Sequence, residues 1–154
     1  MLPFEQNIIP TTPNVISRFE KPAEVSSKIF SVNSQFEKKV WAELETKSII
    51  KPFELCGDKF KVFEVIDFSG DHKLVSARLS TINPPTKNFL LIWNSSFNAL
   101  VTDFDTVIHH WDDFFCPSSD DLYIISQDKN LILYFAHFEC LNIGQYLTDN
   151  KLYM

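Results

Sequence analysis

Residues 109–125, His-His-Trp-Asp-Asp-Phe-Phe-Cys-Pro-Ser-Ser-Asp-Asp-Leu-Tyr-Ile-Ile, gather two histidines, one cysteine and four aspartates in a single stretch. Imidazole, thiolate and carboxylate groups are common ligands of transition metals, and they also act as general acids, bases and nucleophiles. The stretch therefore suggests either a metal or catalytic site or an acidic surface that binds another protein.

A metal site in this stretch would need ligands that share one face. His109 and His110 are adjacent, so on a helix they point about 100° apart, whereas His109 and Asp113 have an i, i+4 spacing that could hold one ion. His137 and Cys140 form a second pair, but no Cys-x-x-Cys or His-x-x-x-His motif accompanies either pair. We therefore expect no metal and no cofactor. A small metal-dependent hydrolase that uses His109, Asp113 and His137 is the alternative.

Motifs for nucleotide binding and for nucleophilic catalysis are missing. The three glycines are isolated, so neither a phosphate-binding loop nor a dinucleotide fingerprint is present. There is no Gly-x-Ser-x-Gly elbow, and Ser126-Gln-Asp-Lys129 matches Ser-x-x-Lys at an expected turn between strands rather than at a helix start. The sequence thus predicts a protein that is not an enzyme, although a triad assembled from distant residues stays open.

Charge is unevenly distributed along the chain, whose 14 Lys and Arg and 20 Asp and Glu give a net charge of −6. Residues 88–128 contain seven aspartates and no Lys or Arg. Binding to nucleic acid requires cations that replace phosphate counterions, so nucleic acid is not an expected partner. The acidic segment is either a solvated face or a docking surface for a basic protein. The candidate partner-binding residues are Asp103, Asp105, Asp112, Asp113, Asp120 and Asp121.

Length and composition predict one globular domain over residues 1–154. The chain is 45% hydrophobic and contains 15 phenylalanines, enough to build a core. Its apolar runs are far shorter than the roughly 20 residues that span a membrane, and residues 1–7 lack the basic and apolar regions of a secretory signal. We therefore expect a cytoplasmic protein without membrane contact, in which Cys56, Cys116 and Cys140 are free thiols.

Two helices and a mainly antiparallel sheet are expected to position the acidic stretch. Residues 34–47 show the helical spacing of Phe36, Val40 and Leu44, and residues 106–115 show a second apolar stripe with Asp105 as its N-cap. The Pro-rich segment 1–32 is expected to be irregular, with short edge strands at 14–19 and 27–32. Further strands are expected at 59–68, 74–80, 89–93, 99–104, 122–126 and 131–138. This mixture predicts an α+β fold.

Three features occur together in residues 88–145: Trp111-Asp-Asp-Phe-Phe, then Pro117-Ser-Ser-Asp-Asp, then a hydrophobic strand pair that ends in His137-Phe-Glu-Cys140 and Gly144. This pattern resembles the C-terminal half of small acidic bacterial immunity proteins, which accompany polymorphic toxins, including those of contact-dependent growth inhibition.

The resemblance implies stoichiometric inhibition without turnover. The protein would bind the C-terminal domain of its cognate toxin inside the producing cell, through the acidic surface around 103–121. Many such toxins are nucleases with basic clefts, which that surface would cover. An adaptor domain without catalysis is a further alternative.

Overall fold

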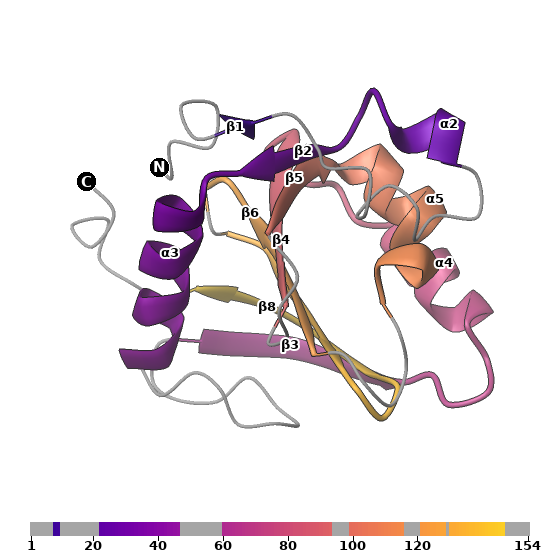
Figure 1. Ribbon diagram of the computed structural model, residues 1–154. Helices are drawn as coiled ribbons and strands as arrows, with labels where there is room; N and C mark the ends of the chain where they lie inside the picture. Colours follow the sequence, from indigo (N-terminus) through magenta and orange to yellow (C-terminus); the bar gives the residue numbers. More distant parts are fainter. Residues whose placement is uncertain are drawn as a thin grey trace.

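The computed structural model describes residues 8–9, 22–46, 60–93, 99–115, 121–128 and 130–146, which form a single α+β domain (Figure 1). The helices are α2 (Pro22–Val25), α3 (Ser34–Thr46), α4 (Lys73–Leu79) and α5 (Phe104–Phe114), and the strands are β1 (Ile8–Ile9), β2 (Phe30–Val32), β3 (Phe60–Asp67), β4 (Asn88–Trp93), β5 (Leu100–Asp103), β6 (Leu122–Ser126), β7 (Ile132–Ala136) and β8 (Cys140–Tyr146).

The described strands form one sheet in the order β1-β2-β5-β4-β6-β7-β8-β3, and every neighbouring pair is antiparallel. Antiparallel neighbours can be joined by short turns, as β6 and β7 are, and β7 and β8. The α+β class and the antiparallel sheet predicted from the sequence are therefore confirmed.

Helices cover both faces of this sheet. In Figure 1, α3 lies on one side of the strands, whereas α2, α4 and α5 lie on the other. All residues of Phe89–Trp93, Leu122–Ser126 and Ile132–Ala136 are consequently buried, in the three central strands β4, β6 and β7. Burial on both faces explains why these strands are nearly continuous hydrophobic runs rather than alternating sequences.

Helix α3 begins where the sequence predicted. The side chain of Asn33 accepts a hydrogen bond from the Phe36 amide at 2.8 Å, which caps the helix, and Phe36 and Val40 are buried against the sheet. The strand expected at 27–32 is present as Phe30–Val32, whereas the strand expected at 14–19 lies outside the described residues.

The strand predicted at 74–80 is wrong, because these residues form helix α4. Val75 and Leu79 are both buried, and their i, i+4 spacing places them on one face of a helix that packs against the sheet. Ala77, which completed the alternating pattern, is exposed. Strand β8 was not predicted, although Leu141 and Ile143 alternate there with polar or small residues.

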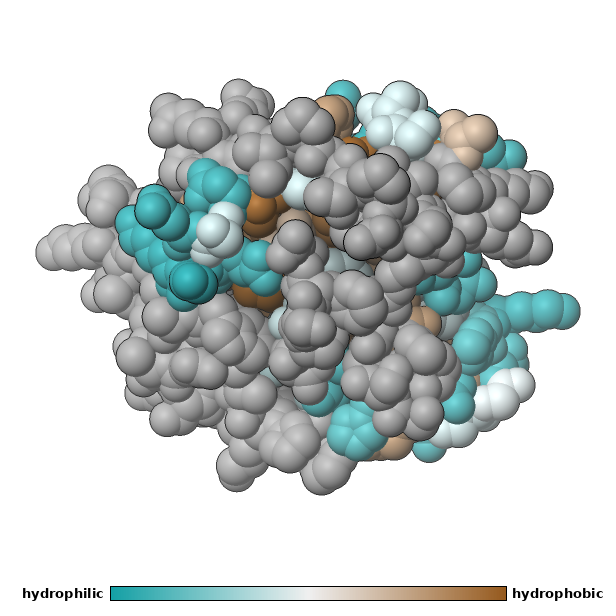
Figure 2. Space-filling view, in the orientation of Figure 1, coloured by the Kyte–Doolittle hydropathy of each residue, from teal (hydrophilic) through white to brown (hydrophobic). Residues whose placement is uncertain are grey.

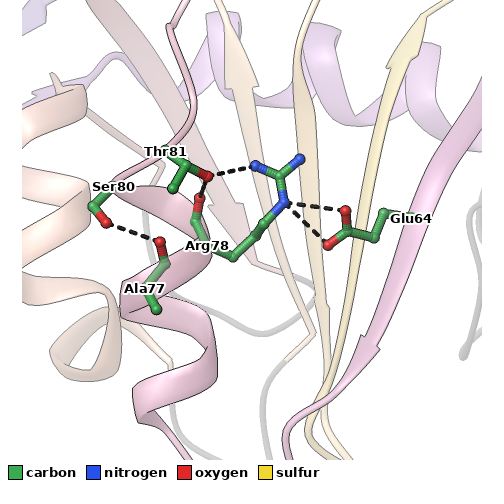
Figure 3. Close-up of polar contacts among 5 residues, drawn as sticks. All are labelled: Glu64, Ala77, Arg78, Ser80 and Thr81. Carbon is green, nitrogen blue, oxygen red and sulfur yellow. Dashed lines mark hydrogen bonds and ion pairs between the residues drawn. The ribbon is translucent and has the colours of Figure 1, made fainter.

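Edge strand β3 is tied to its neighbours at two points. Its pairing with β8 shifts register between Val62 and Glu64, which leaves Phe63 as a β-bulge. Arg78 at the end of α4 donates from Nε to both carboxylate oxygens of Glu64, each at 3.1 Å, and from Nη1 to Thr81 at 2.8 Å (Figure 3). This bifurcated hydrogen bond, in which one N–H is shared by two oxygens, holds α4 against β3.

On the face shown in Figure 2, hydrophilic side chains gather over α3 on one side and over α4 on the other, and some hydrophobic side chains are visible beside them. None of the helices in the described ranges is long and apolar enough to cross a membrane. Of the three cysteines, Cys140 is described and is partly buried, whereas Cys56 and Cys116 lie outside the described residues.

Candidate functional site

Helix α5 carries the acidic stretch and is held firmly by the core. Asp103 caps it, accepting a hydrogen bond from the Thr106 amide at 2.7 Å, so the helix begins at Phe104 and the prediction of Asp105 as the cap is wrong. Its inner face is anchored by Trp111, whose ring stacks on Phe135 with centroids 5.4 Å apart. The opposite face turns its polar side chains outward.

A groove of about 630 Å³ runs between this outer face and helix α2. Among the described residues, four carboxylates line it together with one ammonium group, two imidazoles and one hydroxyl. The lining residues are Glu24, Lys28, Asp105, Thr106, His109, His110, Asp112 and Asp113. A cleft of this size falls in the range of ligand-binding pockets. The acidic groove is the candidate site.

The two histidines of the groove bond to neighbours on their own helix. His109 Nδ1 lies 2.8 Å from the carbonyl oxygen of Asp105 and 3.6 Å from its carboxylate. His110 Nδ1 lies 3.3 Å from the carboxylate of Asp113. The sequence suggested instead that His109 and Asp113 would act together. His109 therefore contacts Asp105, and His110 contacts Asp113, at two different places along the groove.

Lys28 is positioned from the opposite side. Its amide donates to the carbonyl of Val25 at 2.9 Å, and its own carbonyl accepts from the Thr102 hydroxyl of β5 at 2.8 Å. These main-chain bonds fix the turn after α2 beside α5, so that a residue distant in sequence comes to share the groove with the aspartates.

The six candidate aspartates do not form one surface. Asp105, Asp112 and Asp113 line the acidic groove, whereas the Asp103 carboxylate caps α5. Asp121 is only 8% exposed, and it accepts hydrogen bonds from the backbone amide of His137 at 2.9 Å.

His137 also makes a side-chain contact with Asp121, through Nδ1 at 3.0 Å. Asp121 therefore braces the start of the turn between β7 and β8, away from the groove lining. Asp120 lies outside the described residues.

The metal-binding alternative is not supported by the arrangement of side chains. His137 is engaged by Asp121 and does not line the acidic groove, so it is not brought together with His109 and Asp113. Among the residues that the structure describes, no group of three or more His, Cys, Asp or Glu side chains is placed to hold a metal ion.

Sequence reasoning missed Glu24, Lys28 and Thr106 as members of the groove. Glu24 and Lys28 are about 80 residues from α5 in sequence. They belong to a helix of four residues and the turn that follows it, and so short an element shows no periodic pattern. Thr106 could have been noticed, because it directly follows Asp105 in the first turn of α5, although it is buried there. No protein-family model matches this chain, and no curated protein matches it either.

Proposed function

We propose that this protein is an immunity protein that binds a basic surface of a toxin domain and neutralises the toxin without catalysis. The observation that carries the proposal is the acidic groove, whose lining includes four carboxylates and one lysine among the residues that the structure describes. Such carboxylates cost little while water solvates them, and they gain favourable interactions when a partner brings Arg and Lys side chains to them. The sequence resemblance to immunity proteins supplies the class of partner.

The groove narrows the set of residues proposed to contact the toxin. Asp105, Asp112 and Asp113 are the proposed contacts, since they line the groove on α5. Asp103 and Asp121 act within the fold, as a helix cap and as a brace of the β7–β8 turn, so they are proposed to position the surface rather than to touch the partner.

The gene for the partner should be sought next to the gene that encodes this protein. A large secreted toxin encoded immediately upstream would provide the domain for binding measurements. We expect one-to-one binding that weakens as salt rises, because the contacting charges are accessible to screening. An adaptor without a toxin partner would instead leave no such gene and no protection of cells against a toxin.

The residues are tested by the triple variant Asp105→Asn, Asp112→Asn, Asp113→Asn. We expect its association rate constant with the toxin domain to fall by roughly ten- to a hundredfold. Charged residues at the edge of an interface mainly accelerate the diffusional encounter of the two proteins. The matched control removes three charges elsewhere: Asp71→Asn before α4, with Glu43→Gln and Glu45→Gln on α3. If the triple variant bound and protected like the parent, the groove would not be the docking surface.

A further inference from the structure

We infer that helix α5 binds a linear triamine of the spermidine type lengthwise in the acidic groove, along the side chains of Asp105, His109 and Asp112. The inference goes beyond the proposed function, because it assigns a small-molecule ligand to the groove and needs no toxin. It is carried by the spacing of these three side chains on one helix, by the orientation of the His109 ring and by a buried hydroxyl beside Asp105.

The three side chains form one row along the helix. Asp105, His109 and Asp112 have an i, i+4, i+7 spacing, which returns them to the same side of α5, and all three are exposed and line the groove. The helical rise separates Asp105 from His109 by about 6 Å along the axis, and His109 from Asp112 by about 4.5 Å. Two carboxylates so far apart are matched by two separate charges rather than by one compact cation.

The middle of the row presents an acceptor. His109 Nδ1 lies 2.8 Å from the carbonyl oxygen of Asp105. Because a carbonyl only accepts, Nδ1 carries the hydrogen of this bond, and Nε2 of the neutral imidazole is then an acceptor. An acceptor between two carboxylates suits a ligand that has an amine in the middle of its chain as well as at both ends.

A buried hydroxyl lies beside the Asp105 end of the row. Thr106 lines the groove although it is only 2% exposed, and its Oγ1 atom is buried without a hydrogen-bond partner. Buried hydroxyls are normally paired, because leaving one unpaired costs free energy. A primary ammonium group has three N–H donors, so it can bond to the Asp105 carboxylate and to this oxygen together.

A triamine with one four-carbon and one three-carbon spacer matches the row. In an extended chain each bond advances about 1.25 Å, so the amines are about 6 Å apart across four carbons and about 5 Å apart across three. The four-carbon spacer therefore lies between Asp105 and His109, and the three-carbon spacer lies between His109 and Asp112. Lys28 also lines the groove and repels a cation bound there, so removing its charge should strengthen binding.

The ligand class is tested on the full chain labelled with ¹⁵N, at constant ionic strength. Spermidine, 1,8-diaminooctane and 1,4-diaminobutane are titrated while amide chemical shifts are followed. The octane compound has the chain length and end amines of spermidine, with a methylene in place of the central amine. We expect spermidine to shift the amides of Asp105, His109 and Asp112 saturably. The octane compound should bind about tenfold more weakly, and the butane compound, which is too short for both carboxylates, should not saturate.

The row is tested by single substitutions with matched controls. His109→Ala should reduce the preference for spermidine over 1,8-diaminooctane to about threefold or less, whereas His109→Gln, which keeps an acceptor on a side chain of similar length, should retain it. Asp112→Asn should weaken spermidine binding by about three- to tenfold. Asp71→Asn makes the same charge change before α4, outside the groove lining, and should weaken it by less than about twofold.

The groove floor and the opposing charge are tested in the same way. Thr106→Val removes the hydroxyl and should weaken spermidine binding by about two- to fivefold, whereas Thr106→Ser, which retains it, should not. Lys28→Met should strengthen binding by about two- to fivefold. The thermal midpoint of each variant shows that it folds.

Four results would overturn the inference: equal affinities of spermidine and 1,8-diaminooctane, saturable shifts outside the groove, equal effects of Asp112→Asn and Asp71→Asn, or unchanged affinity in Thr106→Val. The fate of the proposed function is separate. If spermidine binds as expected but no toxin domain does, the triamine site stands and the immunity role falls. If a toxin domain binds but spermidine does not, the immunity role stands and the triamine site falls.

Discussion

Arg78 and Glu64 are joined through Nε of the guanidinium, which lies 3.1 Å from each carboxylate oxygen. The pair connects the last turn of α4 to edge strand β3, and both side chains are little more than a third exposed (Figure 3). Solvent therefore screens the attraction between the two charges. The pair fixes the position of α4 relative to β3 more than it adds to the stability of the protein.

Breaking this pair should destabilise the protein only slightly. We expect Arg78→Ala and Glu64→Gln each to lower the free energy of unfolding by about 1 kcal/mol or less, since exposed ion pairs contribute little. Urea unfolding of both variants and of the double variant measures the coupling. A loss several times larger, undiminished in high salt, would show that the pair is not screened as described.

The buried indole of Trp111 should matter far more. It stacks on Phe135, contacts Phe68 edge to face with centroids 5.5 Å apart, and donates from Nε1 to the Ser76 hydroxyl at 3.0 Å. Trp111→Ala should cost about 3 to 5 kcal/mol of stability, because it leaves a cavity between α5 and the sheet.

Trp111→Phe is the matched control, since it keeps an aromatic ring in the same site and should cost less. Denaturant midpoints compare the two variants. Equal losses for alanine and phenylalanine would contradict the importance of ring packing.

Gly144 should not tolerate a side chain. A Cβ atom at this position would lie 2.6 Å from the carbonyl oxygen of Lys61 on β3, a backbone atom that cannot move without shifting the strand. Gly144→Ala should therefore destabilise the protein by about 1 to 3 kcal/mol and increase hydrogen exchange in β3.

A useful comparison is Gly70→Ala, because the added methyl there meets nothing within 4 Å, although its φ of +74° is unfavourable for alanine. This variant should lose about 1 to 2 kcal/mol from backbone strain, without raising exchange in β3. Faster exchange in β3 for Gly70→Ala but not for Gly144→Ala would oppose the steric account.

Alkaline stability should depend on Tyr134. Burial raises the pKa of its hydroxyl above the ordinary value, and the nearby Tyr123 and Asp121 raise it further. The unfolded chain releases this proton near pH 10, whereas the folded chain keeps it, so stability is full below pH 10 and falls as the pH rises beyond it.

Tyr134→Phe should flatten this decline in unfolding free energy. Tyr153→Phe, which changes a tyrosine outside the described residues, is the control. Absorbance titration of phenolate should show one fewer late-titrating tyrosine in Tyr134→Phe. A decline of the same slope in both variants would mean that Tyr134 does not govern it.

The sequence predicted those elements whose patterns are long or strongly marked. Helix α3 and helix α5 have apolar stripes over several turns, and the central strands are dense in apolar residues. Helix α4 was missed because its seven residues satisfy a period of two as well as a period of 3.6, and only packing of Val75 and Leu79 decides between them. Strand β8 was missed because Asn142 and Gly144 resemble turn residues, although both are buried in the sheet.

The candidate site was predictable only in part, for a related reason. The acidic face of α5 follows from its local sequence, which places Asp105, Asp112 and Asp113 together. The second wall of the groove depends on the turn after α2, which the Thr102 hydroxyl holds through the carbonyl of Lys28. Such a tertiary contact leaves no periodic trace in the sequence.

The pairing of β3 with β8 affects the order in which the strands of the sheet can form. Strand β3 is the third described strand in the chain, yet its sheet neighbour is β8, whose residues 140–146 are synthesised much later. During translation β3 therefore leaves the ribosome long before a partner exists, and long-range pairings of this kind form late. Chains stopped before residue 140 would leave β3 and one side of β7 unpaired, so we expect β8, the last strand that the structure describes, to complete the sheet and to raise resistance to proteolysis.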